Sequence, residues 1–203
     1  YNTNFTYTNN AGKNVSIKYS KAFMEAAAAS KVSPYHLASR VKQEVVISST
    51  MMSSSVSGNV AGYKGIYNFY NIGANSGANA VKNGLKWAST GTDYSRPWNN
   101  RYRSIYGGAC YIGKQYINVG QNTLYLQKFN VTATKRYDHQ YMANIEAPNN
   151  EATKTANAYG SDKDNTPIVF SIPVYNNMPV SACDIPSGGK NPNNYLKNLY
   201  VQG

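Results

Sequence analysis

The chain has 203 residues, enough to bury one hydrophobic core, and its 20 Lys and Arg against 9 Asp and Glu give a formal net charge of +11. This surplus favours polyanionic partners, but the basic residues are scattered, with no run longer than Lys135-Arg136, which argues against a nucleic-acid-binding arm. The 19 tyrosines, together with many Asn and Ser residues, suit an extracellular protein that faces carbohydrate, and no stretch is apolar enough to span a bilayer.

The N-terminal part predicts an extended arm followed by two helices. Residues 1–19 alternate polar and aromatic positions, as an extended arm does. Ser20 is a capping residue for a short helix over Lys21–Ala29. Lys31–Pro34 predicts a tight link, and Ser33–Val45 predicts a second helix with a capping Ser and a Pro in its first turn.

Glu44 is the most informative residue of this second helix. At about 100° per residue, Leu37, Val41 and Val45 share one apolar stripe, and Glu44 falls inside it. Partial desolvation there raises the pKa of a carboxyl and lets it keep a proton near neutral pH, which is the state a general acid needs. The helix alone is equally compatible with a structural glutamate that is satisfied by a neighbouring Arg or a backbone amide.

The middle of the chain predicts a long loop and two further helices. Ser48–Gly65, rich in Ser, Gly and Met, predicts a loop or small hairpin beside the carboxylate, and loops of that length are commonly functional. Ile66–Ala74 is dense in aromatic and amide side chains. Helical spacing returns over Ala78–Ala88 and over Trp98–Tyr116, whereas Thr123–Phe129 indicates a strand or an extended crossing.

The C-terminal part predicts helices followed by a short β-containing extension. Helices are expected over His139–Glu146 and from Pro148 to Tyr159. Beyond Gly160, five prolines exclude long helices, while Ile168–Ile172 and Val174–Tyr175 predict short strands. The expected organisation is a single mainly helical domain over 1–203, with an arm (1–19), a core (20–160) and a Pro/Asn-rich extension (161–203) that packs on the core.

Several blocks in chain order resemble one family of enzymes. They are Leu37–Val45, Tyr67–Ala74, Gly84–Ala88 with Arg96–Trp98, Asn122–Phe129 and His139–Ile145, and Ile172–Pro179 is similar to a segment that often follows. Together they resemble the glucosaminidase domains of bacterial autolysins, glycoside hydrolase family 73, and particularly those of clostridial cell-wall hydrolases. The resemblance covers roughly residues 20–160.

The resemblance implies a lysozyme-like fold (α+β) with a small β or loop lobe flanking a catalytic cleft. The implied reaction is endo-hydrolysis of peptidoglycan at the β-1,4 bond between N-acetylglucosamine and N-acetylmuramic acid. By motif match Glu44 is the general acid, and Tyr141 falls where the family has a tyrosine at the catalytic centre. The residues expected to bind substrate are Asn68, Phe69, Tyr70, Asn71, Trp98 and Tyr137. Of these, Trp98 also lies on a helical stripe and fits a core position.

A second catalytic carboxylate is not evident, because residues 45–92 contain no Asp or Glu. The next acid is Asp93, which is either that carboxylate or a loop ion pair with Arg96; Asp138 and Glu146 fit exposed helix charges. Two mechanisms follow. In the favoured one, the 2-acetamido group of the substrate attacks the anomeric carbon with retention; in the other, a water positioned by Tyr141 and a distant carboxylate attacks with inversion.

Three other functions are weighed against this one. A muramidase on the same fold would cut the alternative bond, and residue chemistry does not separate the two. A non-catalytic cell-wall binding module would use the same basic, tyrosine-rich surface, but binding alone does not need a desolvated acid at Glu44. Nucleic-acid binding is allowed by the charge and disfavoured by the lack of a basic cluster.

The remaining expectations concern cofactors, cysteines and location. His36 and His139 are the only histidines and have no ligand spacing, so neither a metal nor a cofactor is expected. Cys110 fits a small core residue, and whether it pairs with Cys183 is open. The expected partners are peptidoglycan glycan strands and anionic wall polymers, without nucleic acid or a membrane span. Because the chain opens at Tyr1, it is interpreted as a mature or excised part of a secreted, cell-wall-associated monomer.

Overall fold

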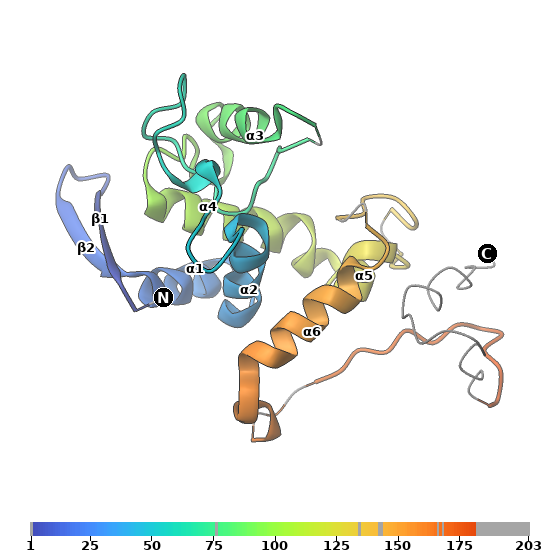
Figure 1. The fold of residues 1–203 in the computed structure, drawn as a ribbon. Coiled ribbons are helices and arrows are strands. Elements are labelled where there is room, and N and C mark those ends of the chain that lie inside the picture. The colour runs from blue at the N-terminus through green and yellow to red at the C-terminus, as the bar shows by residue number, and fades with distance from the viewer. Residues whose placement is uncertain are drawn as a thin grey trace. The chain divides into compact units, whose positions relative to one another are not determined.

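The computed structural model describes residues 2–75, 77–133, 135–141, 144–165, 167 and 169–181 (Figure 1). The chain forms two compact units, Tyr1–Asn122 and Thr123–Gly203, and each is described by itself. Among the described residues, no helix is both long and apolar enough to cross a membrane. The expectation of a single domain stays a prediction.

The first unit opens with an antiparallel hairpin of β1 (Asn4–Thr8) and β2 (Asn14–Lys18), where only an extended arm was expected (Figure 1). The side chain of Asn9 closes the turn, because its Oδ1 accepts bonds from the backbone N–H groups of Ala11 and Lys13, both at 3.0 Å. Phe5 and Ile17 are paired across the strands and are both buried, so one face of the hairpin joins the core.

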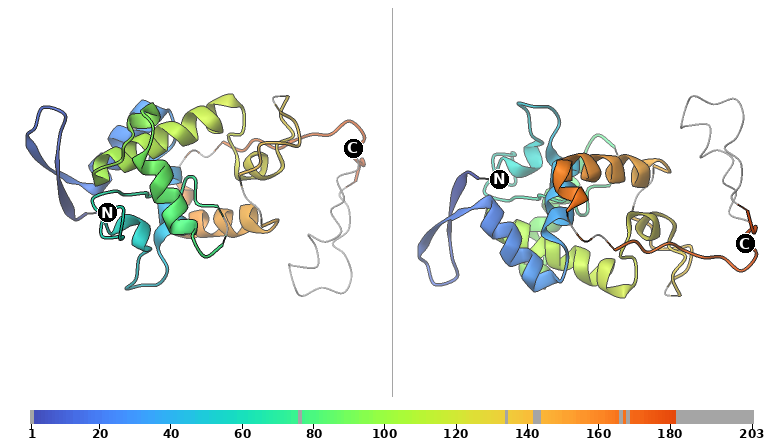
Figure 2. Two further views of the ribbon diagram at one scale, coloured as in Figure 1. Left: turned by 90° about the horizontal axis from the view of Figure 1, so that it is seen from above. Right: turned by 90° about the horizontal axis from the view of Figure 1, so that it is seen from below.

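Two helices follow, as the sequence predicts, but the predicted serine caps are wrong. Helix α1 (Tyr19–Ser30) contains Ser20, has Lys18 as its N-cap and ends at Lys31, which is left-handed with a φ of 57°. Helix α2 (Pro34–Val45) begins directly after Ser33, whose side chain makes no capping bond, and carries the proline in its first turn. Its apolar stripe is confirmed, since Leu37, Val41 and Val45 are buried. Helix α1 packs against both α2 and α4, and Figure 2 shows α1 lying along α4.

The rest of the first unit consists of helices joined by loops. They are the 3-10 helices η1 (Ser54–Val56), η2 (Asp93–Ser95) and η3 (Ile117–Val119), and the α-helices α3 (Ala80–Ser89) and α4 (Arg101–Gln115). The expected helix over Trp98–Tyr116 begins later, because Pro97 precedes Trp98 and Asn100 caps α4 by accepting a 2.8 Å bond from the N–H of Arg103.

Two adjacent glycines let α4 lie in the centre of this unit. Gly107 and Gly108 are buried, and a Cβ on Gly108 would collide with the ring of Tyr70. A Cβ on Gly107 would collide with the backbone carbonyl of Tyr94 and the indole nitrogen of Trp98. The helix therefore contains two residues of low helix propensity, because neighbouring residues of the same unit lie too close to α4 to leave room for a side chain at either position.

The second unit contains α5 (Leu124–Phe129), α6 (Ala147–Tyr159) and the 3-10 helix η4 (Gly160–Asp164), and α5 packs against α6. The expectation of a strand or extended crossing over 123–129 is wrong, because Thr123 caps a short helix with a 3.1 Å bond from the N–H of Leu126. The expected helix over His139–Glu146 is also wrong for its described residues, which form turns and bends, and His139 is left-handed with a φ of 55°. The helix from Pro148 to Tyr159 is confirmed.

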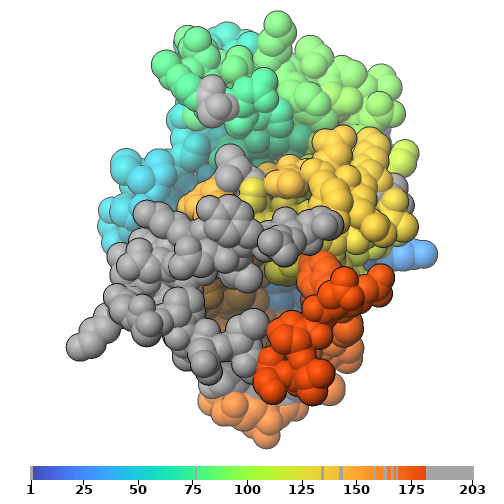
Figure 3. All heavy atoms as spheres, turned by 90° about the vertical axis from the view of Figure 1, so that its right-hand side faces the viewer, coloured from blue at the N-terminus to red at the C-terminus, as the bar shows by residue number. Residues whose placement is uncertain are grey.

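The described residues 167 and 169–181 form no strand, although short strands were expected there; Ile168 lies outside the described residues. Apolar side chains in this segment are exposed, including Val169 at 91%, Phe170 at 78% and Val174 at 83% (Figure 3, orange-red). Pro167, Pro173 and Pro179 lack backbone N–H donors, which disfavours pairing in a sheet. The packing of the extension on the core stays a prediction.

Candidate active site

Glu44 lies in the last turn of α2 and is partly buried. The chain leaves the helix at Val46 and returns at once, because Val46 forms an isolated antiparallel bridge with Met52 and the N–H of Ser53 donates to the carbonyl of Val45 at 2.7 Å. Glu44 therefore stands at the base of a short closed loop. The predicted loop or small hairpin after this helix is confirmed in this form.

Asn71 contacts Glu44 through its side-chain amide. Its backbone is left-handed, with a φ of 49°, and its side chain is partly buried. The amide Nδ2 lies 2.6 Å from the backbone carbonyl oxygen of Glu44 and 3.5 Å from the carboxylate Oε2. The short bond ties the end of α2 to the loop that follows η1, and the long one brings an amide donor to the edge of the carboxylate.

Asn68 fixes the turn that carries Asn71. Its fully buried Nδ2 donates to the carbonyls of Ile72 at 2.8 Å and Gly84 at 3.0 Å, and its Oδ1 accepts from the N–H of Ile72 at 3.2 Å. A Cβ on Gly84 would lie only 3.0 Å from Asn68 Nδ2, so a larger residue there would require Asn68 to shift by a few tenths of an ångström. The amide of Asn68 thus serves the backbone and not a ligand.

Three aromatic residues expected to bind sugar lie in the core. Phe69, Tyr70 and Trp98 are 3%, 1% and 0% exposed. The Tyr70 hydroxyl donates to the carbonyl of Ile105 at 3.3 Å, and Ser104 Oγ accepts from the N–H of Phe69 at 3.1 Å. These rings, like Asn68, present no surface to a sugar in this structure. Their placement disagrees with a direct contact and indicates that they support the turn beside Glu44.

Asp93 lies in η2 and is exposed, with 81% of its side chain accessible. Its carboxylate is 3.8 Å from the guanidinium of Arg96, and its carbonyl accepts from Arg96 Nε at 3.1 Å. This is the loop ion pair that the sequence offered as an alternative. A role for Asp93 as a second catalytic carboxylate stays a prediction.

Tyr137 and Tyr141 belong to the second unit, where a buried amide organises their loop. Asn130, at the end of α5, donates from Nδ2 to the carbonyls of Lys135 at 2.7 Å and Asp138 at 2.6 Å. The N–H of Tyr137 returns a 2.8 Å bond to the Asn130 carbonyl, and Tyr137 is 54% exposed. Tyr141 is partly buried, and its N–H donates to α5. Asn130 was not among the predicted site residues, although an Asn just past a helix end is a recognisable cap.

The remaining titratable residues do not form a metal site in the described part of the chain, where no three His, Cys, Asp or Glu side chains gather. On α2, burial and the nearby charge of Arg40 lower the pKa of His36 to about 3. His36 is thus partly buried, and not exposed as a position near the helix start suggests. Burial raises the pKa of the Cys110 thiol; Cys183 lies outside the described residues, so the pairing question stays open.

No protein-family model matches the chain. It is 30% identical over 168 residues to the β-N-acetylglucosaminidase of Bacillus subtilis (strain 168), which covers 81% of this chain and 18% of that protein. It is 32% identical over 109 residues to the bifunctional autolysin of Staphylococcus epidermidis (strain ATCC 12228 / FDA PCI 1200), covering 54% of this chain and 8% of that protein. The chain therefore spans less than a fifth of the length of these curated relatives.

Solved structures of S. aureus Autolysin E share the fold. The complex with the muropeptide NAM-L-Ala-D-iGlu matches at a TM-score of 0.55 and 27% identity, covering 70% of this chain and 60% of that one. A second structure of Autolysin E matches at a TM-score of 0.54 and 25% identity, with 70% and 59% covered. The chain is a mainly helical, lysozyme-like protein, homologous to a segment of the B. subtilis β-N-acetylglucosaminidase and to Autolysin E.

Proposed function

We propose that this chain is the catalytic part of an autolysin that hydrolyses peptidoglycan between N-acetylglucosamine and N-acetylmuramic acid. The observation that carries the proposal is a partly buried carboxyl at the end of helix α2, with an amide from a separate loop beside it, in a chain homologous to a β-N-acetylglucosaminidase. The muropeptide bound by the structural homologue Autolysin E supports peptidoglycan as the substrate class.

Glu44 is assigned as the general acid that protonates the leaving glycosidic oxygen. Two features of its surroundings suit this role. The C-terminal end of a helix carries negative partial charge, which disfavours a carboxylate and favours a protonated carboxyl. Asn71 ties the Glu44 backbone in place and brings its amide within 3.5 Å of the carboxylate, which limits where the carboxyl can lie.

The nucleophile in this proposal is the 2-acetamido group of the substrate. Its oxygen attacks the anomeric carbon while Glu44 donates a proton to the leaving oxygen, and water then opens the cyclic intermediate with Glu44 acting as base. The lack of any Asp or Glu between residues 45 and 92 supports this route, as does the pairing of Asp93 with Arg96. Tyr141 is proposed to line the catalytic centre, and Tyr137 and Asn71 to contact the sugar.

The test is digestion of purified peptidoglycan by the wild type and by Glu44→Gln, with borohydride reduction and mass spectrometry of the reducing ends. We expect reduced N-acetylglucosamine ends from the wild type and a loss of about 10³-fold or more in rate for the variant, which keeps the shape of the residue but cannot donate an acid proton. Reduced muramic acid ends would identify a muramidase, and no fragments from either protein would indicate a binding module.

The same products test the mechanism. Participation of the acetamido group predicts retention of the anomeric configuration, which NMR of the first-formed product reports. Inversion would remove this route in favour of a water held by Tyr141 and a carboxylate. Secretion, association with the cell wall, binding to anionic wall polymers through the basic surface, and a monomeric state belong to the same proposal.

A further inference from the structure

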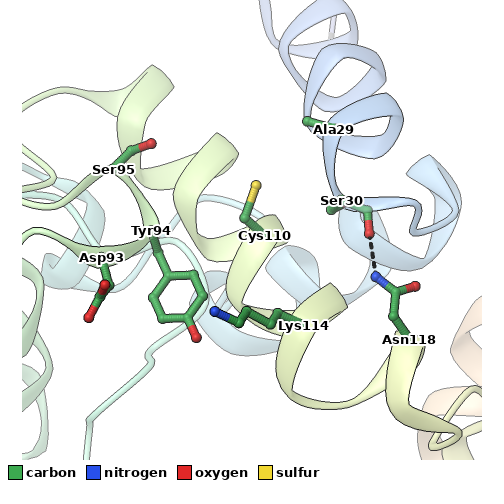
Figure 4. A pocket seen from close by; sticks show the side chains of 8 residues that line it. All are labelled: Ala29, Ser30, Asp93, Tyr94, Ser95, Cys110, Lys114 and Asn118. Carbon is green, nitrogen blue, oxygen red and sulfur yellow. Dashed lines mark hydrogen bonds between the residues drawn. The ribbon is translucent and has the colours of Figure 1, made fainter.

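Two cavities of the first unit share one wall and lie along helix α4. The first, about 400 Å³, lies between the hairpin turn and the start of α4 and includes Tyr7, Asn10, Arg103 and Tyr106. The second, about 410 Å³, lies between η2, α1 and the end of α4 and includes Tyr94, Cys110 and Lys114 (Figure 4). Ser95 lines both cavities, and neither includes Glu44 or Asn71.

The α4 residues of both cavities form one continuous stripe. Tyr102, Tyr106, Cys110 and Lys114 are each four positions apart, so their side chains lie on one face of the helix. At 1.5 Å per residue this stripe is about 18 Å long. We call this stripe, with the hairpin turn and η2 as its walls, the α4 groove. Its length suits a segment of a polymer better than one small molecule.

Stacked tyrosines line the hairpin end of the α4 groove. The rings of Tyr7 and Tyr102 are parallel within 3°, with centroids 4.6 Å apart, and Tyr106 follows at 5.9 Å from Tyr102. The Tyr102 hydroxyl donates a 2.8 Å bond to Glu25 on α1, which holds the stack in place. Among the described residues, Tyr106 has no ring partner other than Tyr102, so it ends the stack. A terminal aromatic face is the surface on which the C–H face of a pyranose ring packs.

Polar groups beside the stack can bind the substituents of a sugar. Arg103 is fixed by bonds from Nε to the Ser95 carbonyl at 2.9 Å and from Nη2 to the Arg96 carbonyl at 3.3 Å, which leaves its Nη1 for a ligand. Within the described part of the chain, neither the Tyr106 hydroxyl nor the exposed amide of Asn10 makes a hydrogen bond. An amide, a hydroxyl and a guanidinium are the groups that bind sugar hydroxyls and acetamido oxygens.

The far end of the α4 groove combines a cation with a strained loop. Tyr94 and Ser95 are both left-handed, with φ values of 54° and 60°, and such strain is concentrated at functional sites. Gln115 holds the Tyr94 hydroxyl at 2.7 Å, and Lys114 extends its ammonium toward the Tyr94 ring, 5.8 Å from the centroid (Figure 4). The exposed Lys114 can pair with a carboxylate on a chain that stacks at the other end.

We propose that the α4 groove is a second glycan-binding site, which holds a strand of N-acetylated hexosamines with one ring on Tyr106 and a carboxylate substituent at Lys114. The site is separate from the residues around Glu44 and requires no chemistry from them. In an enzyme that acts on an insoluble polymer, it would keep the protein on the strand between cleavages.

The test is a titration of the full chain carrying Glu44→Gln, so that no ligand is consumed, followed by backbone amide NMR. The probes are the hexamer of N-acetylglucosamine and soluble, peptide-free glycan strands that contain muramic acid. We expect saturable shifts at Ser95, Arg103 and Tyr106 with both probes, weakened three- to tenfold by Tyr106→Ala. Lys114→Ala should weaken only the muramic acid strands, which distinguishes the two sources of N-acetylhexosamine.

The controls separate this inference from the proposed function. Tyr35→Ala removes an exposed tyrosine from the start of α2 and should leave the titration unchanged. Asn10→Ala, at an exposed turn, should weaken binding even if Tyr106→Ala were to disturb the fold. Shifts confined to residues around Asn71 would overturn the second site and leave the proposed function intact. Shifts confined to residues of the α4 groove would support the second site and contradict substrate binding around Glu44.

Discussion

The side-chain amide of Asn71 is bonded to the backbone carbonyl of Glu44 at 2.6 Å, across 27 residues of sequence. Asn71 adopts a left-handed conformation to reach it, and the turn beneath it is held by Asn68, whose amide also bonds to α3 at Gly84. The position of the proposed acid is therefore determined by a buried polar network and not by helix α2 alone.

Two substitutions at Asn71 test the role of its side-chain amide and the role of its left-handed backbone conformation separately. Asn71→Gly keeps the left-handed conformation without strain but loses the bond to Glu44, and Asn71→Ala loses the bond and adds strain. We expect both variants to lose roughly 10- to 100-fold in kcat on peptidoglycan, because a displaced acid is costly to the rate. Asn71→Ala should in addition be about 1–2 kcal/mol less stable than Asn71→Gly, measured by urea unfolding.

Asn59→Ala, in an exposed loop, is the matched control and should change neither quantity. Normal kcat in Asn71→Gly would show that the amide does not position Glu44, whatever the stability of Asn71→Ala.

Asn68→Ala should reduce the free energy of unfolding by about 2–4 kcal/mol, because it breaks bonds to Ile72 and Gly84 and leaves their backbone groups buried without those partners. Equilibrium urea denaturation measures the change, with Asn59→Ala as the exposed comparison. A loss below about 0.5 kcal/mol would mean that water or backbone movement replaces these bonds.

Gly108→Ala should reverse the usual effect of adding a methyl group to a helix. In an open helix the change stabilises by about 1 kcal/mol, but here the Cβ would collide with the ring of Tyr70. We expect a net destabilisation of about 1–3 kcal/mol, measured by thermal or urea unfolding. The double variant with Tyr70→Leu should recover part of the loss; additive effects in this double-mutant cycle would contradict the proposed collision.

His36 should make stability depend on pH. Its Nε2 is buried and has no hydrogen-bond partner among the described residues, and the pKa of His36 is lowered to about 3, against 6.5 for an ordinary histidine. Between these two values the unfolded chain binds a proton that the folded chain does not, so stability falls as pH falls from about 6.5 toward 3, by up to about 1.4 kcal/mol per pH unit.

His36→Gln removes this contribution without a large change in volume. Urea midpoints at pH 4.5 and pH 7 should therefore differ less in the variant than in the wild type. The carboxyl groups contribute equally to both proteins and cancel in the comparison. Equal pH dependence in the two proteins would show that His36 is protonated as readily in the folded state as in the unfolded one.

Local sequence signals predicted some elements well and others poorly. The start of α2 follows from Pro34 in its first turn and its course from the apolar stripe, both within one segment, although Ser33 makes no side-chain capping bond. Thr123–Phe129 indicated a strand or an extended crossing, but Thr123 accepts a capping bond from the N–H of Leu126 and the segment forms a short helix. Over 139–146 the apolar spacing suggested a helix, whereas the buried amide of Asn130 holds the preceding loop in turns.

Most helices of the first unit, the resemblance to glucosaminidases and the choice of Glu44 could be predicted from the sequence, because a charged residue on an apolar stripe is visible in a single segment. The burial of Phe69, Tyr70 and Trp98 and the contact of Asn71 with Glu44 depend on the tertiary structure. Aromatic and amide side chains serve equally well in a core or in a sugar site. Which of the two applies depends on what packs against them from distant parts of the chain, and short-range patterns carry no information about that.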